Sequence, residues 1–108
     1  KIDKENLLKV IVTDEFTEWL NGIKDIEAKA TINLKIRTLA CGGSVDVKAV
    51  REKLFEIRIF KKPGYRVYYS IIDDLIVFYG GIKKSQTRDI NKAIKLMKKW
   101  EAGNAGRV

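Results

Sequence analysis

The residues whose types and spacing best suit chemistry lie in FEIRIFKKPGYRVYYS, residues 55–70. This stretch places Glu56, Arg58 and Arg66 among residues that otherwise favour β-strands. Guanidinium groups bind phosphate oxygens through paired hydrogen bonds and stabilise the charge that develops on a transferring phosphoryl group. The two arginines therefore suggest a phosphate site, with the glutamate close by.

Alternation of side chains across a strand decides whether the two arginines can meet. Burying the apolar residues of both segments together requires odd positions to face odd positions, because a shift by one residue would place charges in the core. We therefore expect Arg58 and Arg66 on one face, as direct neighbours if Phe60 pairs with Gly64. Adjacent like charges on a sheet are unfavourable by roughly a few tenths of a kcal/mol, so stability does not require them. The alternative is a solvated face held by an Arg–Glu–Arg network, each pair contributing about 0–1 kcal/mol.

Further cations and aromatic rings are expected near the arginines. They are Lys61 and Lys62 at the hairpin tip, Lys83 and Lys84 after the last predicted strand, and the rings of Phe60 and Tyr68. Such a combination suits an RNA backbone with unpaired bases stacked beside it. Lys83 and Lys84 also lead into the last predicted helix, whose first backbone amides favour anions.

Composition limits the possible functions. The 108 residues include 22 Lys plus Arg against 14 Asp plus Glu, a formal charge of +8, which favours nucleic acid as partner or serves solubility alone. Histidine is absent, which excludes histidine-based nucleophile and acid–base systems. Cys41 is the single cysteine and has no metal-ligand spacing around it, so we expect a reducing, cytoplasmic setting. The sequence shows no signal peptide and no apolar run near 18 residues, so nothing in it predicts secretion or a membrane span.

Hydrophobic periodicity predicts the elements that must position these residues within a single domain, 1–108, with a core at about 8–100. We expect a strand at 8–13, followed by a helical hairpin that is capped by Asp14, broken at Asn21 and Gly22, and ended by Gly42 and Gly43. Strands are then expected at 45–50, 54–60, 65–72 and 75–79, with a break at Gly80 and Gly81. The final helix is capped by Ser85 or Thr87 and frays after Trp100.

Three segments carry a resemblance to a known family. They are FTEWLNGIKDIEAKATINLKIRTLACGGSVDVKAV, FEIRIFKKPGYRVYYS and LIVFYGGIKKSQTRDINKAIKL, with EIRI, PGYRVYY and GGIKKSQTRDI as the most specific pieces. Over about residues 11–97 the chain resembles the HigB-like addiction module killer proteins of the RelE/ParE toxin superfamily. The resemblance implies an α+β fold of the RelE-like kind, a twisted and mostly antiparallel sheet of about five strands with an N-terminal helical hairpin and a C-terminal helix.

The resemblance also implies a function. HigB and RelE proteins are bacterial, cytoplasmic toxins that cut mRNA in the A site of the 70S ribosome and so inhibit translation. A cognate helix-turn-helix antitoxin, HigA-like in this branch, neutralises them. The implied partners are thus the antitoxin and ribosome-bound mRNA, without a membrane, a metal ion or an organic cofactor.

Site roles carry over by position from the family. Arg66 matches the arginine that contacts the scissile phosphate, Arg58 a basic residue on the neighbouring strand, and Lys83 or Lys84 a cation that supports the leaving group. The remaining expected site residues are Asp89 at a C-terminal acidic position, and Lys61, Lys62, Phe60, Tyr68 and Arg88 as RNA-binding residues. Glu56 and Ile90 stand where the RelE branch has a lysine and a tyrosine, which leaves the acid and base open.

The simplest mechanism without histidine is attack of a ribose 2'-hydroxyl on its own phosphate, with Glu56 as base and both arginines on the phosphate. Two other functions remain open. A ParE-like protein on the same fold would poison DNA gyrase by binding, and a plain RNA-binding module would use its charges for affinity alone.

Overall fold

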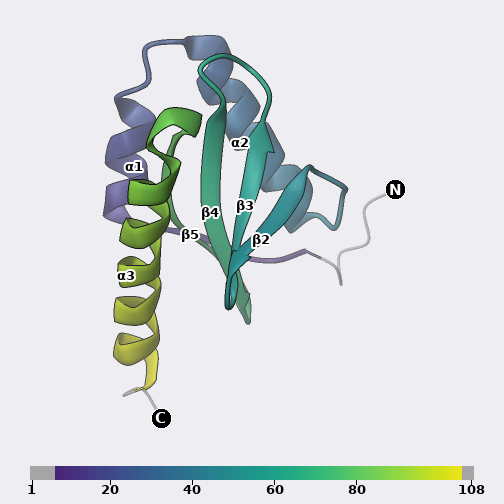
Figure 1. Cartoon of the computed structure of the whole chain (residues 1–108). Helices are drawn as coiled ribbons and strands as arrows, with labels where there is room; N and C mark the ends of the chain where they lie inside the picture. The colour runs from purple at the N-terminus through teal and green to yellow at the C-terminus, as the bar shows by residue number, and fades with distance from the viewer. Residues whose placement is uncertain (1–6, 106–108) are drawn as a thin grey trace.

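The computed structural model of the chain describes residues 7–105. The elements in chain order are β1 (Val10–Val12), α1 (Asp14–Asn21), α2 (Ile26–Ala40), β2 (Val47–Arg51), β3 (Leu54–Ile59), β4 (Tyr65–Ile72), β5 (Asp74–Ile82), a 3-10 turn (Lys83–Ser85) and α3 (Gln86–Ala105). The fold is α+β, with a five-stranded sheet and a C-terminal helix (Figure 1).

Side-chain caps fix the starts of both N-terminal helices. The Thr13 hydroxyl accepts a hydrogen bond from the Phe16 amide at 3.0 Å, and the Asp25 carboxylate accepts one from the Ala28 amide at 3.1 Å. The predicted cap of α1 was therefore one residue late, because Asp14 is already the first helical residue. The predicted break between the two helices is confirmed, since α1 ends at Asn21.

The sheet has the order β1–β5–β4–β3–β2 and is mixed rather than antiparallel. Its pairs β2–β3, β3–β4 and β4–β5 are antiparallel, as expected for strands joined by short connections. β1 pairs in parallel with β5, because the chain passes through both N-terminal helices and three further strands before β5 forms. The expected antiparallel character thus fails at this one edge.

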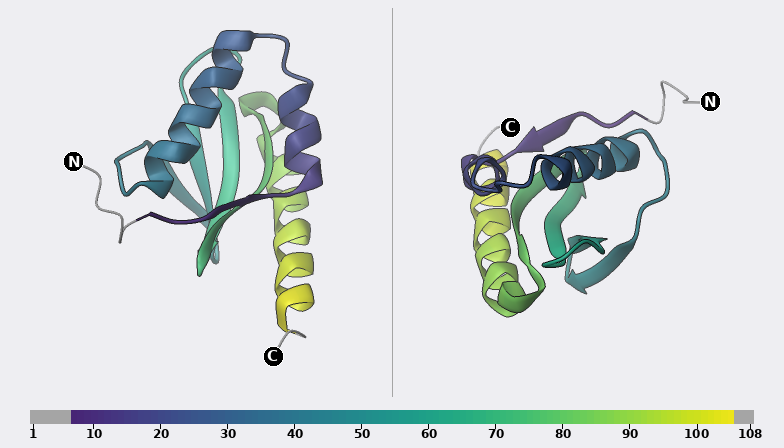
Figure 2. Two further views of the ribbon diagram at one scale, coloured as in Figure 1. Left: turned by 180° about the vertical axis from the view of Figure 1, so that it is seen from behind. Right: turned by 90° about the horizontal axis from the view of Figure 1, so that it is seen from above.

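The sheet is covered on both faces (Figure 2). On one face α1 and α2 pack against odd-numbered residues of β3, β4 and β5, such as Ile57 and Val67. On the other face α3 packs through Ala93, Leu96 and Met97 against Tyr68 and its neighbours. The predicted alternation is confirmed, and it places Glu56, Arg58 and Arg66 on the α3 side.

Two expectations about the C-terminal region were wrong. Gly80 and Gly81 do not break β5 but lie within it, and a methyl group added to either would overlap Trp19 or Asp89 respectively. The glycines therefore let the helices on both sides of the sheet approach the strand. The last helix continues beyond Trp100 to Ala105, where fraying was expected.

Candidate functional site

Arg58 and Arg66 are direct cross-strand partners in β3 and β4, the arrangement expected if the register also paired Phe60 with Gly64. Their side chains point to the face that α3 covers. The Nε atoms of both arginines and the Nη1 atom of Arg66 are buried and have no hydrogen-bond partner among the residues that the structure describes. Buried donors are rarely left in this state, so the pair retains capacity to bind an anion.

Arg66 lies on the α3 side of the sheet and is only 7% exposed. Below it, Glu56 is fully buried, and its Oε1 atom lies 3.8 Å from Arg66 Nε, beyond hydrogen-bond distance. The Gln86 side-chain amide, from α3, donates to the same oxygen at 2.7 Å. Glu56, expected to be the base, is therefore closed off from solvent and balances the charge of Arg66. Gln86 was missed by sequence reasoning, because nothing in its spacing marks it.

Arg58 lies at the margin of the helix layer, with 34% of its side chain exposed. Its Nη2 atom lies 2.9 Å from Asp46 Oδ1, and its guanidinium carbon is 5.7 Å from the centre of the Phe60 ring. Phe60 is 79% exposed, so its ring is open to a ligand as expected. Asp46 was also missed, although the register that places residue 46 beside the end of β3 would have indicated it.

Tyr68 was expected to stack on RNA bases, but the structure leaves its side chain fully buried beneath α3. Burial, reinforced by the negative charges of Glu56 and Asp89, raises the pKa of its hydroxyl far above the ordinary tyrosine value. In this position Tyr68 presents no ring face to a ligand and carries no charge at neutral pH.

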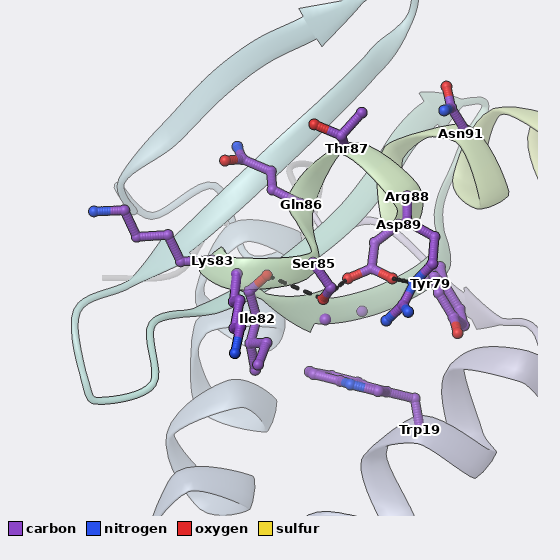
Figure 3. Close-up of a pocket in the computed structure, with 13 residues that line it drawn as sticks. Trp19, Tyr79, Ile82, Lys83, Ser85, Gln86, Thr87, Arg88, Asp89 and Asn91 are labelled. Atoms are coloured by element: carbon purple, nitrogen blue, oxygen red, sulfur yellow. Dashed lines mark hydrogen bonds and ion pairs between the residues drawn. The ribbon is translucent and has the colours of Figure 1, made fainter.

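A pocket of about 1070 Å³ opens beside the end of β5 and the first turn of α3 (Figure 3). Asp89 is buried at its base, accepts a hydrogen bond from the Ser85 hydroxyl, and lies 3.8 Å from Arg88 Nε. The opposite wall is Trp19 of α1. Gly81 of β5, which lines the pocket, pairs with Arg66 of β4, so the pocket lies beside the strand that carries Arg66.

The predicted lysines fall into two groups. Lys61 contacts Asp25 and Glu27, each at 3.1 Å, and the hydrogen bonds to Glu27 and Asp25 raise its pKa. This lysine is therefore occupied within the fold. The other three, Lys62, Lys83 and Lys84, are exposed and have no ion-pair partner among residues 7–103. The Lys83 amide donates to the Gly64 carbonyl at 2.8 Å, which ties this lysine to the β3–β4 hairpin.

The described residues also limit the kind of site. They contain no group of three or more Asp, Glu, His or Cys side chains that could hold a metal ion. Within the same part of the chain, no helix combines the length and apolar character needed to cross a membrane.

The sequence of the chain is similar to that of a known bacterial protein. The chain is 38% identical over 88 residues to a protein of Haemophilus influenzae that is described as uncharacterized, and the match covers 80% of this chain and 89% of that protein. No family model matches the chain. No solved structure matches it either.

Proposed function

The chain belongs to the same family as this Haemophilus influenzae protein, and on the geometry of its arginines we propose that it is the toxin of a type II toxin–antitoxin system. In this proposal it has the RelE-like fold and is a ribosome-dependent mRNA endoribonuclease of the HigB kind. The observation that carries the proposal is the cross-strand pair Arg58–Arg66, whose buried N–H donors lack partners. A phosphodiester would supply the missing acceptors.

The reaction is a transfer within the RNA strand. The 2'-oxygen forms a bond to the adjacent phosphorus while the bond to the 5'-oxygen breaks, which leaves a 2',3'-cyclic phosphate and a 5'-hydroxyl end. Arg58 and Arg66 bind the phosphate oxygens and stabilise the charge that develops on them. Lys83 and Lys84, exposed after β5, stabilise the charge on the leaving 5'-oxygen, which takes a proton from water to become the 5'-hydroxyl.

The proton of the 2'-hydroxyl needs an accessible acceptor. Glu56 is fully buried, so in this proposal it positions Arg66 and does not take the proton. Asp46 lies beside Arg58 and keeps 37% of its side chain exposed, which makes it the carboxylate that a ribose bound at the pair would meet. We therefore assign the acceptor role to Asp46.

The test compares variants that leave the fold intact. Arg66→Lys keeps a positive charge opposite Glu56 but lacks the planar fork, and Arg58→Ala removes a partly exposed side chain. Each is expected to lower message cleavage on translating ribosomes by about 100-fold or more. Asp46→Asn is expected to lower cleavage by about 100-fold through loss of the acceptor.

Cleavage is read by primer extension on cellular mRNA, together with growth arrest, and a thermal melt confirms folding of each variant. Arg37→Ala is the control, because Arg37 is an exposed arginine on α2, on the other side of the sheet. Full cleavage by well-folded Arg66→Lys and Arg58→Ala proteins would refute the proposed site. Rescue of growth by a helix-turn-helix protein encoded next to the gene would identify the antitoxin.

The burial of Glu56 favours a second candidate of another class. A ParE-like gyrase poison needs no proton acceptor, and the carboxylate nearest to Arg66 is closed off from solvent. The two candidates differ in what they damage. A gyrase poison produces DNA breaks and no defined message ends, so the same primer extension, with a DNA-break assay beside it, separates them.

A further inference from the structure

One flank of α3 carries a row of four cations, Arg88, Lys92, Lys95 and Lys99, which we name the α3 stripe. Their spacing of four, three and four residues places them on one side of the helix. All four are exposed. The opposite side of the helix packs into the core beneath it, so the α3 stripe faces away from the sheet. The helix α3 itself runs along one flank of the molecule (Figure 1).

Little within the fold offsets these charges. Among the residues that the structure describes, the only ion pair of the stripe is the contact of 3.8 Å between Arg88 and Asp89. The acidic residues of α3 are engaged elsewhere, since Asp89 is buried against Ser85 and Glu101 pairs with Lys53 at 3.2 Å. Like charges three or four residues apart destabilise a helix, so the row reduces the stability of the isolated chain.

The dimensions of the stripe suit a nucleic-acid backbone. At about 1.5 Å per residue, Arg88 and Lys99 are about 17 Å apart along the helix axis. A nucleic-acid duplex carries about one charge per 1.7 Å of its axis when both strands are counted, so a length of about 17 Å holds about ten phosphates, and the stripe can contact those few that face it. A membrane surface is a poorer match, because the apolar residues that would enter the lipid, such as Leu96 and Met97, are buried in the core.

We propose that the α3 stripe binds the phosphate backbone of a folded RNA, as an anchoring surface separate from the arginine pair. The inference rests on the proposed function in that the RNA meant is that of the ribosome. Arg88 lines the pocket that also contains Lys83 and Lys84, and the stripe runs from there toward the end of α3. The stripe increases the affinity for the RNA, and the cleavage reaction takes place at Arg58 and Arg66.

The experiment compares two triple variants that remove equal charge. The stripe variant is K92Q/K95Q/K99Q, and the control is K9Q/K24Q/K48Q, whose lysines are also exposed and lie outside α3. Binding to purified small ribosomal subunits and to an oligouridine strand is measured across a range of salt concentrations. With about 0.9 counterions released per phosphate contact, the stripe variant should lose about 2 to 3 units of the salt slope on the subunits, and the control less than one.

Folding and charge are controlled separately. A thermal melt checks each protein, and K92R/K95R/K99R should retain the salt slope of the wild type. Equal losses in the stripe variant and the control would overturn the proposal, since net charge alone would then explain binding. Binding to vesicles of anionic lipid is measured in parallel, and a loss confined to oligouridine or to these vesicles would overturn the proposal as well. Binding repeated with Arg66→Lys should show the same loss of salt slope, because the stripe acts apart from the arginine pair. A wild-type protein that shows the stripe effect but never cuts mRNA refutes the nuclease and not the anchor.

Discussion

Replacing Glu56 by Gln tests whether this carboxylate balances the buried charge of Arg66. The glutamine keeps an oxygen that can accept the hydrogen bond from Gln86, so the change removes charge and little else. At 3.8 Å and an effective dielectric constant of about 20, the lost attraction is about 4 kcal/mol. Breaking one partner of a buried pair costs about 3–5 kcal/mol in other proteins. We expect Glu56→Gln to lower the free energy of unfolding by about 3 kcal/mol, or the melting temperature by at least about 10 °C.

A double-mutant cycle with Arg66→Met isolates the interaction, measured by urea unfolding of the wild type, both single variants and Glu56→Gln/Arg66→Met. The double variant leaves no buried charge at this position, so we expect it to be more stable than either single variant. Lys53→Met is the reference for an exposed pair, since its contact to Glu101 should be worth at most about 1 kcal/mol. A cost of Glu56→Gln no larger than that of Lys53→Met, with no coupling to Arg66, would refute the reasoning.

Two further predictions concern the packing under α3. Gly81→Ala should lower the free energy of unfolding, measured by urea titration, by about 1–3 kcal/mol, because the added methyl group overlaps the buried Asp89 carboxylate. Gly103→Ala is the control: nothing lies within 4 Å of the added methyl group, so its free energy of unfolding should equal or exceed that of the wild type. Tyr68→Phe should flatten the loss of stability in alkali. The pKa of Tyr68 is raised in the folded chain, so its contribution is complete below the ordinary value of 10.0 and is lost as the pH rises above it. A difference in unfolding free energy between wild type and Tyr68→Phe that does not shift in favour of Tyr68→Phe above this pH would contradict the raised pKa.

The sequence was sufficient to predict that the two arginines share a face, because burying the odd-numbered apolar residues of β3 and β4 excludes a shift by one residue, and their direct pairing followed only if Phe60 paired with Gly64. It could not show what covers the opposite face. Alternation groups Glu56, Arg66 and Tyr68 together, yet the same pattern fits a solvated face and a face under a helix. The periodicity of α3 reveals its apolar side but not which strands that side meets.

The break expected at Gly80 and Gly81 failed for a related reason. Glycine pairs interrupt strands when they supply backbone flexibility, but here they supply space for Trp19 and Asp89. That use depends on residues about 60 positions upstream and eight positions downstream, which no local pattern can report. The mixed sheet was likewise hidden, since whether β1 joins in parallel depends on which edge it reaches.

The two arginines differ in how an incoming phosphate would reach them. Arg58 is held by Asp46 in a half-exposed pair, and pairs of this kind contribute only about 0–1 kcal/mol, so a phosphate can replace the carboxylate at little cost. Arg66 is held by Glu56 in a buried pair whose loss costs about 3–5 kcal/mol. A phosphate should therefore bind Arg58 first, and it can meet Arg66 only at the 8% of this side chain that is exposed, without displacing Glu56. The buried carboxylate then keeps Arg66 in place while the arginine works, so Glu56 serves both the stability of the fold and the position of the guanidinium group.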